Sequence, residues 1–411
     1  MHNSKLPRRR ANDLYVDTWL PEETQAMRQE VRAFAEKELA PIAHQLNTTP
    51  ENKDNFPWEL MKKMGDAGIL RIPYAKEMGG RGLKYPLLAS QVAEEELAYF
   101  SNGAAAALYD APMALLGASL LRFAPDEIAQ TYLPQLMSGE ITGSFATSEP
   151  AASTDLSPDV LSTIAEAVPG GFRVNGAKRW ITNACVASVL VFLCKTEEGL
   201  TMLFTRMDEE GITVSDPDKK MGNLAQLTSD ITFDNVFVPE ANVIGQKGRG
   251  LRVALSALTE GRVAVASMGV GLGQAAFDHA TEFMEQRKVF GKTLSSMQHW
   301  QNIFANYAIE LENARNLCYK AAYVIDTTGG TESPLGPMAK TYATKLSSKI
   351  ASDAMQVCGA MGFVRELGAT GELRPIEAIY RDTKIGEIYE GANEVMLTVI
   401  ARSIFGKNVA V

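Results

Sequence analysis

The chain has 411 residues, of which 46% are hydrophobic and 22% charged, and its formal net charge is −9. A chain of this length and composition is expected to form two or three globular domains. The acidic balance excludes binding to nucleic-acid phosphates as the main activity, because that activity needs a concentrated basic surface. The four cysteines and four histidines are scattered without metal-ligand spacing, so neither a disulfide framework nor a metal site is expected.

Residues 1–20 are expected to form a disordered tail. Their basic part, Lys5 to Arg10, lacks the apolar core of a secretory signal. No apolar run in the chain reaches the roughly 18 residues that span a bilayer. The sequence therefore predicts neither export nor a membrane location.

Residues 21–140 are predicted to form a helical domain. Pro21-Glu22-Glu23 opens the first helical pattern, with proline early and acids in the first turn. Apolar residues then recur at helical spacing, and glycine-containing turns separate the runs. The further helical runs cover residues 58–67, 87–100, 104–122 and 125–137.

Residues 141–240 have the pattern of short strands. The strands are expected at 163–168, 172–174, 189–194, 202–205, 212–215 and 231–238. Because turn signals and no helices separate them, an antiparallel barrel or sandwich is predicted. Residues 241–411 return to helical periodicity and predict a bundle, with long helices at 251–290, 294–325, 337–361 and 389–404.

Near the end of the chain, Tyr389-Glu390-Gly391 precedes an apolar helical run. Taken alone, this stretch is typical of a helix start, because an acid near the N-terminus of a helix is favoured by the helix dipole. The alternative is a catalytic base whose backbone can approach a ligand because glycine follows it. These residues by themselves do not decide between the two interpretations.

Five motifs occur in order along the chain. They cover residues 144–150, 174–183, 287–292 with Gln298, 356–359 and 389–391. In this order and in these domains, the set resembles the acyl-CoA dehydrogenase family, over residues 21 to 406. The resemblance implies an α+β, mostly helical fold, with an N-terminal helical domain, a central antiparallel β-barrel or sandwich domain and a C-terminal four-helix bundle.

The resemblance also implies an FAD-dependent oxidoreductase that acts on the CH–CH group of an acyl-CoA in fatty acid or amino acid degradation. A base takes the Cα proton, and Cβ delivers a hydride to flavin N5. The base is implied to be Glu390, whose backbone N–H donates to the thioester carbonyl. Some relatives carry the base at the position of Gly261, and Glu260 would point about 100° away from there. The implied substrate contacts are Thr154, Arg262, Tyr389 and Gly391.

A larger set of residues is implied to bind FAD. Those expected around the flavin are Phe145, Thr147, Ser148, Thr154, Trp180, Thr182, Ala392 and Glu394. Arginine suits a pyrophosphate because it offers paired donors. The residues expected to hold the pyrophosphate and adenine of a neighbouring subunit, or to lie near them, are Arg287, Phe290, Gln298, Gln356 and Gly359. A site shared between subunits implies an oligomer, a tetramer by family habit.

The sequence departs from the family pattern at several positions. In the loop after Glu149-Pro150, Ala151 and Ser153 replace glycines, and Thr154 replaces a serine. Leu224 stands where arginine is frequent, and Ala392 where threonine is common. These changes are interpreted as differences in substrate or in local packing, with FAD binding retained.

Two alternatives to a dehydrogenase remain open: a flavin oxidase or monooxygenase on the same fold, and a non-catalytic flavin-binding or DNA-associated relative. The retained Glu390 disfavours the oxidase, and the acidic charge disfavours the DNA-associated protein. The expected partners are an acyl-CoA substrate and electron-transfer flavoprotein. The expected location is the cytoplasm of a bacterium or the mitochondrial matrix of a eukaryote. The absence of a further domain after Gly406 argues against the membrane-associated very-long-chain class.

Overall fold

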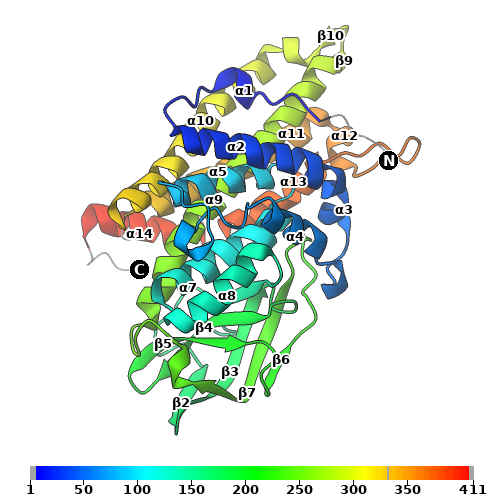
Figure 1. The fold of residues 1–411 in the computed structure, drawn as a ribbon. Coiled ribbons are helices and arrows are strands. Elements are labelled where there is room, and N and C mark those ends of the chain that lie inside the picture. The colour runs from blue at the N-terminus through cyan, green and yellow to red at the C-terminus, as the bar shows by residue number, and fades with distance from the viewer. Residues whose placement is uncertain (1–5, 331–332, 407–411) are drawn as a thin grey trace.

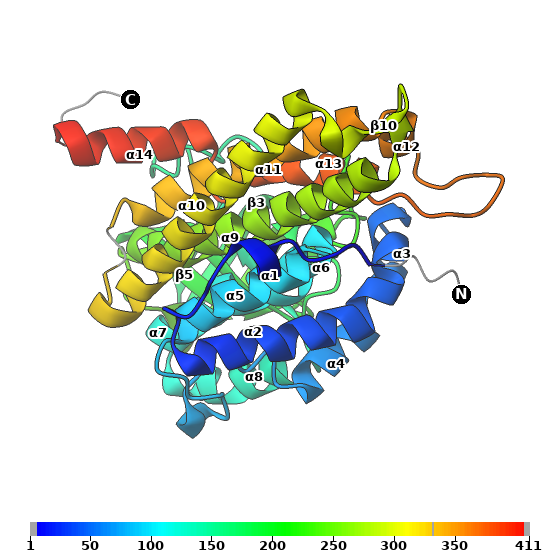
Figure 2. The ribbon, with the colours of Figure 1, turned by 90° about the horizontal axis from the view of Figure 1, so that it is seen from above.

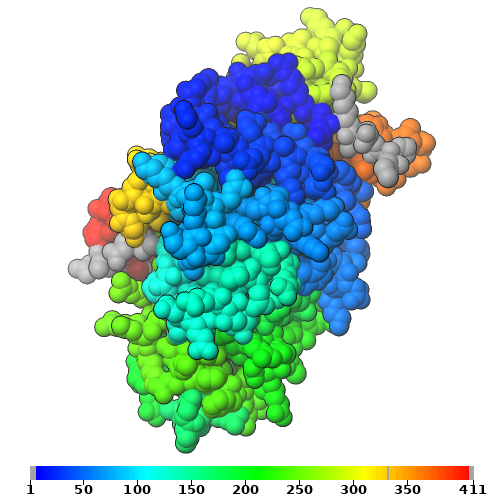
Figure 3. All heavy atoms as spheres, in the orientation of Figure 1, coloured from blue at the N-terminus to red at the C-terminus, as the bar shows by residue number. Residues whose placement is uncertain are grey.

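The computed structural model describes residues 6–330 and 333–406. An N-terminal group of helices, a central β-sheet and a C-terminal group of long helices follow one another along the chain, and the sheet lies at one end of the molecule (Figure 1). In the space-filling view from the same side, residues of the N-terminal helices cover the front of the C-terminal ones (Figure 3). The predicted mostly helical α+β fold class is confirmed.

The N-terminal part packs short helices around two buried ones, α5 and η5. Nearly every residue of α5 and all of η5 is buried, so both are core helices. η5 has wide π-type turns and carries Pro112 inside, where proline removes a backbone donor. The elements are α1 (Ala11–Leu14), α2 (Glu22–Phe34), η1 (Ala35–Leu39), η2 (Ala40–Ile42), α3 (Ala43–Thr48), η3 (Lys53–Asn55), α4 (Trp58–Asp66), η4 (Lys76–Met78), α5 (Pro86–Ala98), α6 (Asn102–Ala105), η5 (Ala106–Gly117), α7 (Ala118–Phe123) and α8 (Asp126–Ser138).

Residues 6–20 are ordered and packed, in contrast to the disordered tail expected there. The guanidinium of Arg9 lies 3.2 Å from the centroid of the Tyr99 ring and 3.3 Å from the carboxylate of Glu96. A cation held over an aromatic face and beside a carboxylate is stabilised on both sides. The basic segment is thus anchored on α5, and no local pattern in the sequence indicates these distant partners. The rest of the expected tail, residues 1–5, lies outside the described residues.

The central sheet contains the predicted strands, and its pairing is mixed. The strands are β1 (Gly143–Ala146), β2 (Ile164–Val168), β3 (Gly171–Thr182), β4 (Val189–Thr196), β5 (Gly199–Arg206), β6 (Ile212–Val214), β7 (Thr228–Pro239) and β8 (Val243–Ile244), paired in the order β6-β7-β3-β2-β4-β5-β8. β1 pairs with β4 in parallel, and β2 also meets β4 in parallel at one position. The purely antiparallel prediction is therefore wrong for these pairs, because the chain crosses over through β2 and β3 before it returns as β4.

The C-terminal part contains α9 (Gly250–Gln286), β9 (Lys288–Val289), β10 (Lys292–Thr293), η7 (Leu294–Ser296), α10 (Gln298–Thr328), α11 (Leu335–Cys358), α12 (Ala360–Phe363), α13 (Ile376–Thr383), η8 (Lys384–Glu387) and α14 (Asn393–Phe405). α5 from the N-terminal part packs against α9 and α10, so the two helical parts share one bundle (Figure 2). The first long helix ends four residues before the predicted Phe290, because the β9–β10 hairpin follows it. The last helix begins at Asn393, after the Glu390-Gly391 turn.

Two helical stretches, residues 102–123 and α9, are long and apolar enough to cross a membrane by length and composition. In the structure 94% and 83% of their apolar windows is buried inside the fold. Helices that are apolar all round are ordinary core helices when other elements cover them. Burial inside the fold therefore accounts for the apolar composition of both helical stretches.

A buried ion cluster joins α2, α5 and α10. Arg315 of α10 donates from Nε to Glu95 Oε1 at 2.9 Å, and Arg28 of α2 lies 3.9 Å from the other Glu95 oxygen. Burial alone would raise the pKa of Glu95, but Arg315 and Arg28 outweigh it and lower that pKa to about 2. The cluster fixes the position of α5, which packs against α9 and α10.

Replacing Glu95 by glutamine is expected to destabilise the fold by about 3–5 kcal/mol, because the buried Arg315 loses its counter-charge. The folded-state pKa of Glu95 is depressed, so the stabilisation is present at pH 7 and is lost as the pH falls from 4.5 towards about 2. Denaturant unfolding measures the effect. The control is Glu59→Gln, which breaks an exposed pair with Lys63 and should leave the midpoint nearly unchanged. Equal losses in the two variants would contradict the prediction.

Candidate active site

A cavity of about 1790 Å³ lies where both helical parts meet the sheet. A pocket for one small ligand commonly has about 300–1,000 Å³, so this cavity has room for more than one ligand. Its walls come from η5 and α7, the segment after β1, the end of β3, α9, and the turn before α14. These elements are far apart in the chain, and the fold brings them to one place.

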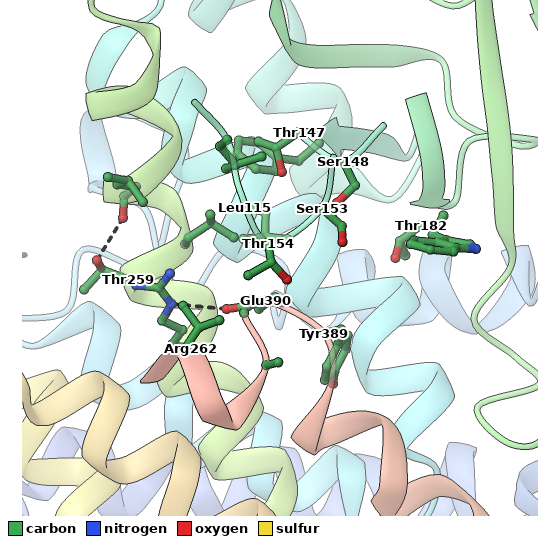
Figure 4. A pocket seen from close by; sticks show the side chains of 18 of the residues that line it. Leu115, Thr147, Ser148, Ser153, Thr154, Thr182, Thr259, Arg262, Tyr389 and Glu390 are labelled. Atoms are coloured by element: carbon green, nitrogen blue, oxygen red, sulfur yellow. Dashed lines mark hydrogen bonds between the residues drawn. The ribbon is translucent and has the colours of Figure 1, made fainter. Parts of the chain in front are cut away.

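The turn at Glu390-Gly391 is held in the left-handed region. The φ angle is 55° at Glu390 and 97° at Gly391. A left-handed conformation costs a residue with a side chain about 1–2 kcal/mol, whereas glycine adopts it freely. Arg262 Nε donates to the carbonyl oxygen of Glu390 at 3.1 Å, and Lys340 Nζ donates to that of Gly391 at 2.7 Å. These two cations on α9 and α11 offset the cost and fix the turn. Figure 4 shows the bond from Arg262 to Glu390.

The side chain of Glu390 occupies the space beside Gly261 of α9. A Cβ placed on Gly261 would lie 2.1 Å from Glu390 Oε2 and 2.7 Å from Leu115 Cδ2. Real Cβ atoms essentially never make contacts this short. A glutamate at position 261 would therefore collide with the Glu390 side chain as it lies here, so the two cannot be present together. Glu260 does not line the cavity, because its carboxylate pairs with Arg122.

The Glu390 carboxylate is buried and only partly compensated. Among the described residues, no backbone, hydroxyl or amide donor forms a hydrogen bond to either of its oxygens. Burial raises its pKa to about 7, although Asp110, Lys340 and Arg262 act in the opposite direction. A dry carboxylate that titrates near neutral pH is suited to taking a proton from a weak carbon acid.

The structure brings most of the predicted site residues to this cavity. Figure 4 shows Thr147, Ser148 and Thr154 on one side of Glu390, with Arg262 on the other. The predicted residues that line the cavity are Phe145, Thr147, Ser148, Thr154, Trp180, Thr182, Arg262, Tyr389, Glu390, Gly391 and Ala392. They come from the sheet region, from α9 and from the turn before α14, so motifs that are far apart in the sequence meet at one cavity.

Comparisons with known proteins agree with this geometry. The acyl-CoA dehydrogenase N-terminal, middle and C-terminal domain models match residues 21–140, 144–236 and 248–405. The chain belongs to the acyl-CoA dehydrogenase family. It is 34% identical to the short-chain specific acyl-CoA dehydrogenase, mitochondrial, of Rattus norvegicus over 400 residues, which cover 96% of this chain and 92% of the rat protein.

Two similar solved structures are acyl-CoA dehydrogenases as well. Butyryl-CoA dehydrogenase from Megasphaera elsdenii is 30% identical, with a TM-score of 0.87 over 95% of this chain and all of the other. A glutaryl-coenzyme A dehydrogenase in complex with glutaryl-CoA is 32% identical, with a TM-score of 0.88 over 95% of this chain and 97% of the other. Enzymes of the family are FAD-dependent oxidoreductases, and the predicted class of enzyme and cofactor is confirmed.

The exposed indole of Trp180 fits a flavin in this acyl-CoA dehydrogenase. Trp180 has a φ of 58° within an irregularity of the β3–β7 pairing, and its backbone N–H donates to Asp230 Oδ1 at 3.2 Å. Such a bulge re-aims a side chain. The residue is 56% exposed and lines the cavity, so a planar aromatic ligand can pack against it. The Thr182 hydroxyl, which accepts from Gln226 Nε2 at 2.9 Å, lines the same wall.

Six predicted cofactor residues do not line this cavity. Glu394 is exposed on the first turn of α14. The other five are exposed near the β9–β10 hairpin and α12, at one end of the bundle (Figures 1 and 2). Phe290 at the hairpin tip is 99% exposed. These five are Arg287, Phe290, Gln298, Gln356 and Gly359.

Sequence reasoning missed several groups at the cavity. Lys340, which holds the turn, looked like an ordinary lysine on a helix. Arg249, Arg252 and Arg402 line the cavity and carry no motif. Asp110 could have been identified from the sequence, because it is the one charged residue in the apolar run 104–117.

Gly261→Ala is expected to lower the rate of catalysis about 100-fold, because the new methyl group displaces Glu390 by roughly 1 Å or more. The fold should persist, since alanine favours a helix. The measurement is the anaerobic rate of flavin reduction by butyryl-CoA. Gly336→Ala on α11 is the control, because its Cβ would meet the nearest atom at 3.5 Å, an ordinary contact. A wild-type rate in Gly261→Ala would refute the steric argument.

Proposed function

We propose that this acyl-CoA dehydrogenase uses Glu390 to remove the Cα proton of a short, uncharged acyl-CoA. The observation that carries the proposal is a buried carboxylate, held in a left-handed turn, inside a cavity with room for a cofactor and a substrate. The neighbouring backbone supports it. In the described residues the N–H of Glu390 donates to no acceptor, so it is free to bind the thioester oxygen.

The chemistry assigned to the chain has two parts. Glu390 takes the Cα proton and becomes a neutral acid, while negative charge develops on the thioester oxygen and is stabilised by the Glu390 N–H. Bound FAD supplies the acceptor for the hydride that leaves Cβ, so that the product is a trans-2-enoyl-CoA. Trp180, Thr182, Thr147 and Ser148 are the residues that we propose hold the flavin ring.

Two lines of evidence support a short and uncharged acyl group. Similar proteins carry the names short-chain specific acyl-CoA dehydrogenase and butyryl-CoA dehydrogenase. In this chain Glu94 and Asp110 are buried near Glu390, and burial together with the charge of Glu390 raises the pKa of both. A terminal carboxylate on the acyl group would add a further negative charge to this dry region, which is unfavourable. Glutaryl-CoA is therefore expected to be a poor substrate.

We also propose a tetramer that passes electrons to electron-transfer flavoprotein. The support for an oligomer is the exposed set around Phe290, which lies at one end of the bundle and does not line this cavity. There it is free to reach the FAD of a neighbouring subunit. The location proposed is the cytoplasm in a bacterium or the mitochondrial matrix in a eukaryote, as the name of the rat relative suggests.

Glu390→Gln is expected to slow anaerobic flavin reduction by butyryl-CoA about 10²–10⁴-fold, because an amide cannot take the proton. The variant should still bind FAD and remain yellow, which separates loss of the base from loss of the cofactor. Glu387→Gln, three residues earlier and outside the cavity, is the matched control. A wild-type rate in Glu390→Gln would show that Glu390 is not the base. Rapid oxygen uptake without another acceptor would favour an oxidase instead.

The rate should also depend on pH in a defined direction. Glu390 acts as a carboxylate, and its pKa is raised to about 7. The value of kcat/KM for butyryl-CoA is therefore expected to rise tenfold per pH unit below about 7 and to level off above it. A midpoint near the ordinary glutamate value of 4.5 would show that burial does not control this group.

A further inference from the structure

Asp110 is a second buried carboxyl group beside the base. It lies on η5, is 2% exposed and lines the same cavity as Glu390. Its Oδ1 is buried and has no hydrogen-bond partner in the described residues. The carboxyl groups of Asp110 and Glu390 are close enough for a direct hydrogen bond when one of them carries a proton.

Two carboxylates in contact in a dry cavity cannot both stay ionised, so the pair holds one proton. The surrounding charges decide which group keeps it. Arg262 and Lys340 both stabilise the charged form of Glu390. Within residues 6–330 and 333–406, no cation lowers the pKa of Asp110, which burial, Glu390 and Glu94 raise well above its ordinary value. The titratable and charged groups that act on the pair are Glu94 from α5, Arg262 from α9, Lys340 from α11, and Tyr389; Glu260 acts on Glu94 instead.

We propose that Asp110 is a positioning residue for the base: it keeps a proton and donates it in a hydrogen bond to Glu390, which stays a carboxylate with one oxygen directed at the substrate. This inference rests on the proposed role of Glu390. Asp110 does not exchange protons with the substrate. It holds the side chain that does, whereas Arg262 and Lys340 hold the backbone.

The η5 helix explains how Asp110 reaches this place. Its wide turns and Pro112 change the direction of the side chains along an otherwise apolar helix. Leu115 of the same helix lies against the space between Gly261 and Glu390. η5 thus supplies an apolar contact and a polar contact to the same glutamate. A lone acid in an apolar core is costly unless it has a partner, and Glu390 is that partner.

The test compares Asp110→Asn and Asp110→Ala in the holoenzyme. The readout is the pH profile of anaerobic flavin reduction by butyryl-CoA between pH 5.5 and 9, each an approximate limit set around the Glu390 pKa of about 7. Asparagine keeps a donor, so its midpoint should stay within about 0.3 pH unit of the wild type. Alanine removes the donor, so its midpoint should rise by about one pH unit or more. Tyr109→Phe, which removes only a bond to Ser90, is the control.

A second readout needs no turnover. In infrared difference spectra at pH 8, about one unit above the Glu390 pKa, the wild type should show a protonated carboxylic acid band that Asp110→Asn lacks. An absent band, a midpoint that falls by about one unit or more in Asp110→Asn, or an unshifted midpoint in Asp110→Ala would overturn the proposal. If Asp110→Ala does not fold, Asp110→Leu, which has a similar size and also lacks a donor, takes its place. An active Glu390→Gln would refute the proposed function itself, so the two failures are distinguishable.

Discussion

Two hydrogen bonds to carbonyl oxygens are the constraint on which this active site depends. Arg262 and Lys340 hold the backbone of Glu390 and Gly391 from two different helices, so the turn is fixed relative to the bundle. Neither cation donates to the Glu390 carboxylate itself, which leaves the side chain free for chemistry. A backbone anchor of this kind positions a base without neutralising it. Glycine at 261 then supplies the space into which the side chain extends.

The same arrangement explains why the site accepts unpaired buried groups that a stable core would avoid. Buried carboxyls without partners weaken a fold, and strained backbone persists only where its surroundings determine it. Here α5 and η5 carry such groups, and α5 is secured elsewhere by the Glu95–Arg315 pair. The ion pairs of Glu95 hold α5 in place, while the cavity carries a glutamate whose pKa burial raises to about 7.

The general architecture could be predicted because hydrophobic periodicity and turn residues are local signals. The strand pattern between 163 and 238 and the long helices after Gly250 follow from them. Features with partners far along the chain could not be predicted. Arg9 finds Glu96 and Tyr99, and β1 pairs in parallel with β4 after a crossover. Glu390 could be proposed as the base from the sequence because its motif is contiguous, whereas Lys340 and Asp110 reach this turn only through folding.

The departures from the family pattern gain a physical meaning from their positions. Ala151 is exposed beside the Glu149–Ala152 bridge, so the added methyl group points into open space. Ser153 and Thr154 line the cavity (Figure 4), and their hydroxyl groups stand where a bare glycine backbone or a smaller serine is usual. Nothing in the structure explains Leu224. A ligand phosphate at this wall could therefore meet the Ser153 hydroxyl, a donor that rotates, in addition to the backbone N–H groups that glycine and serine share.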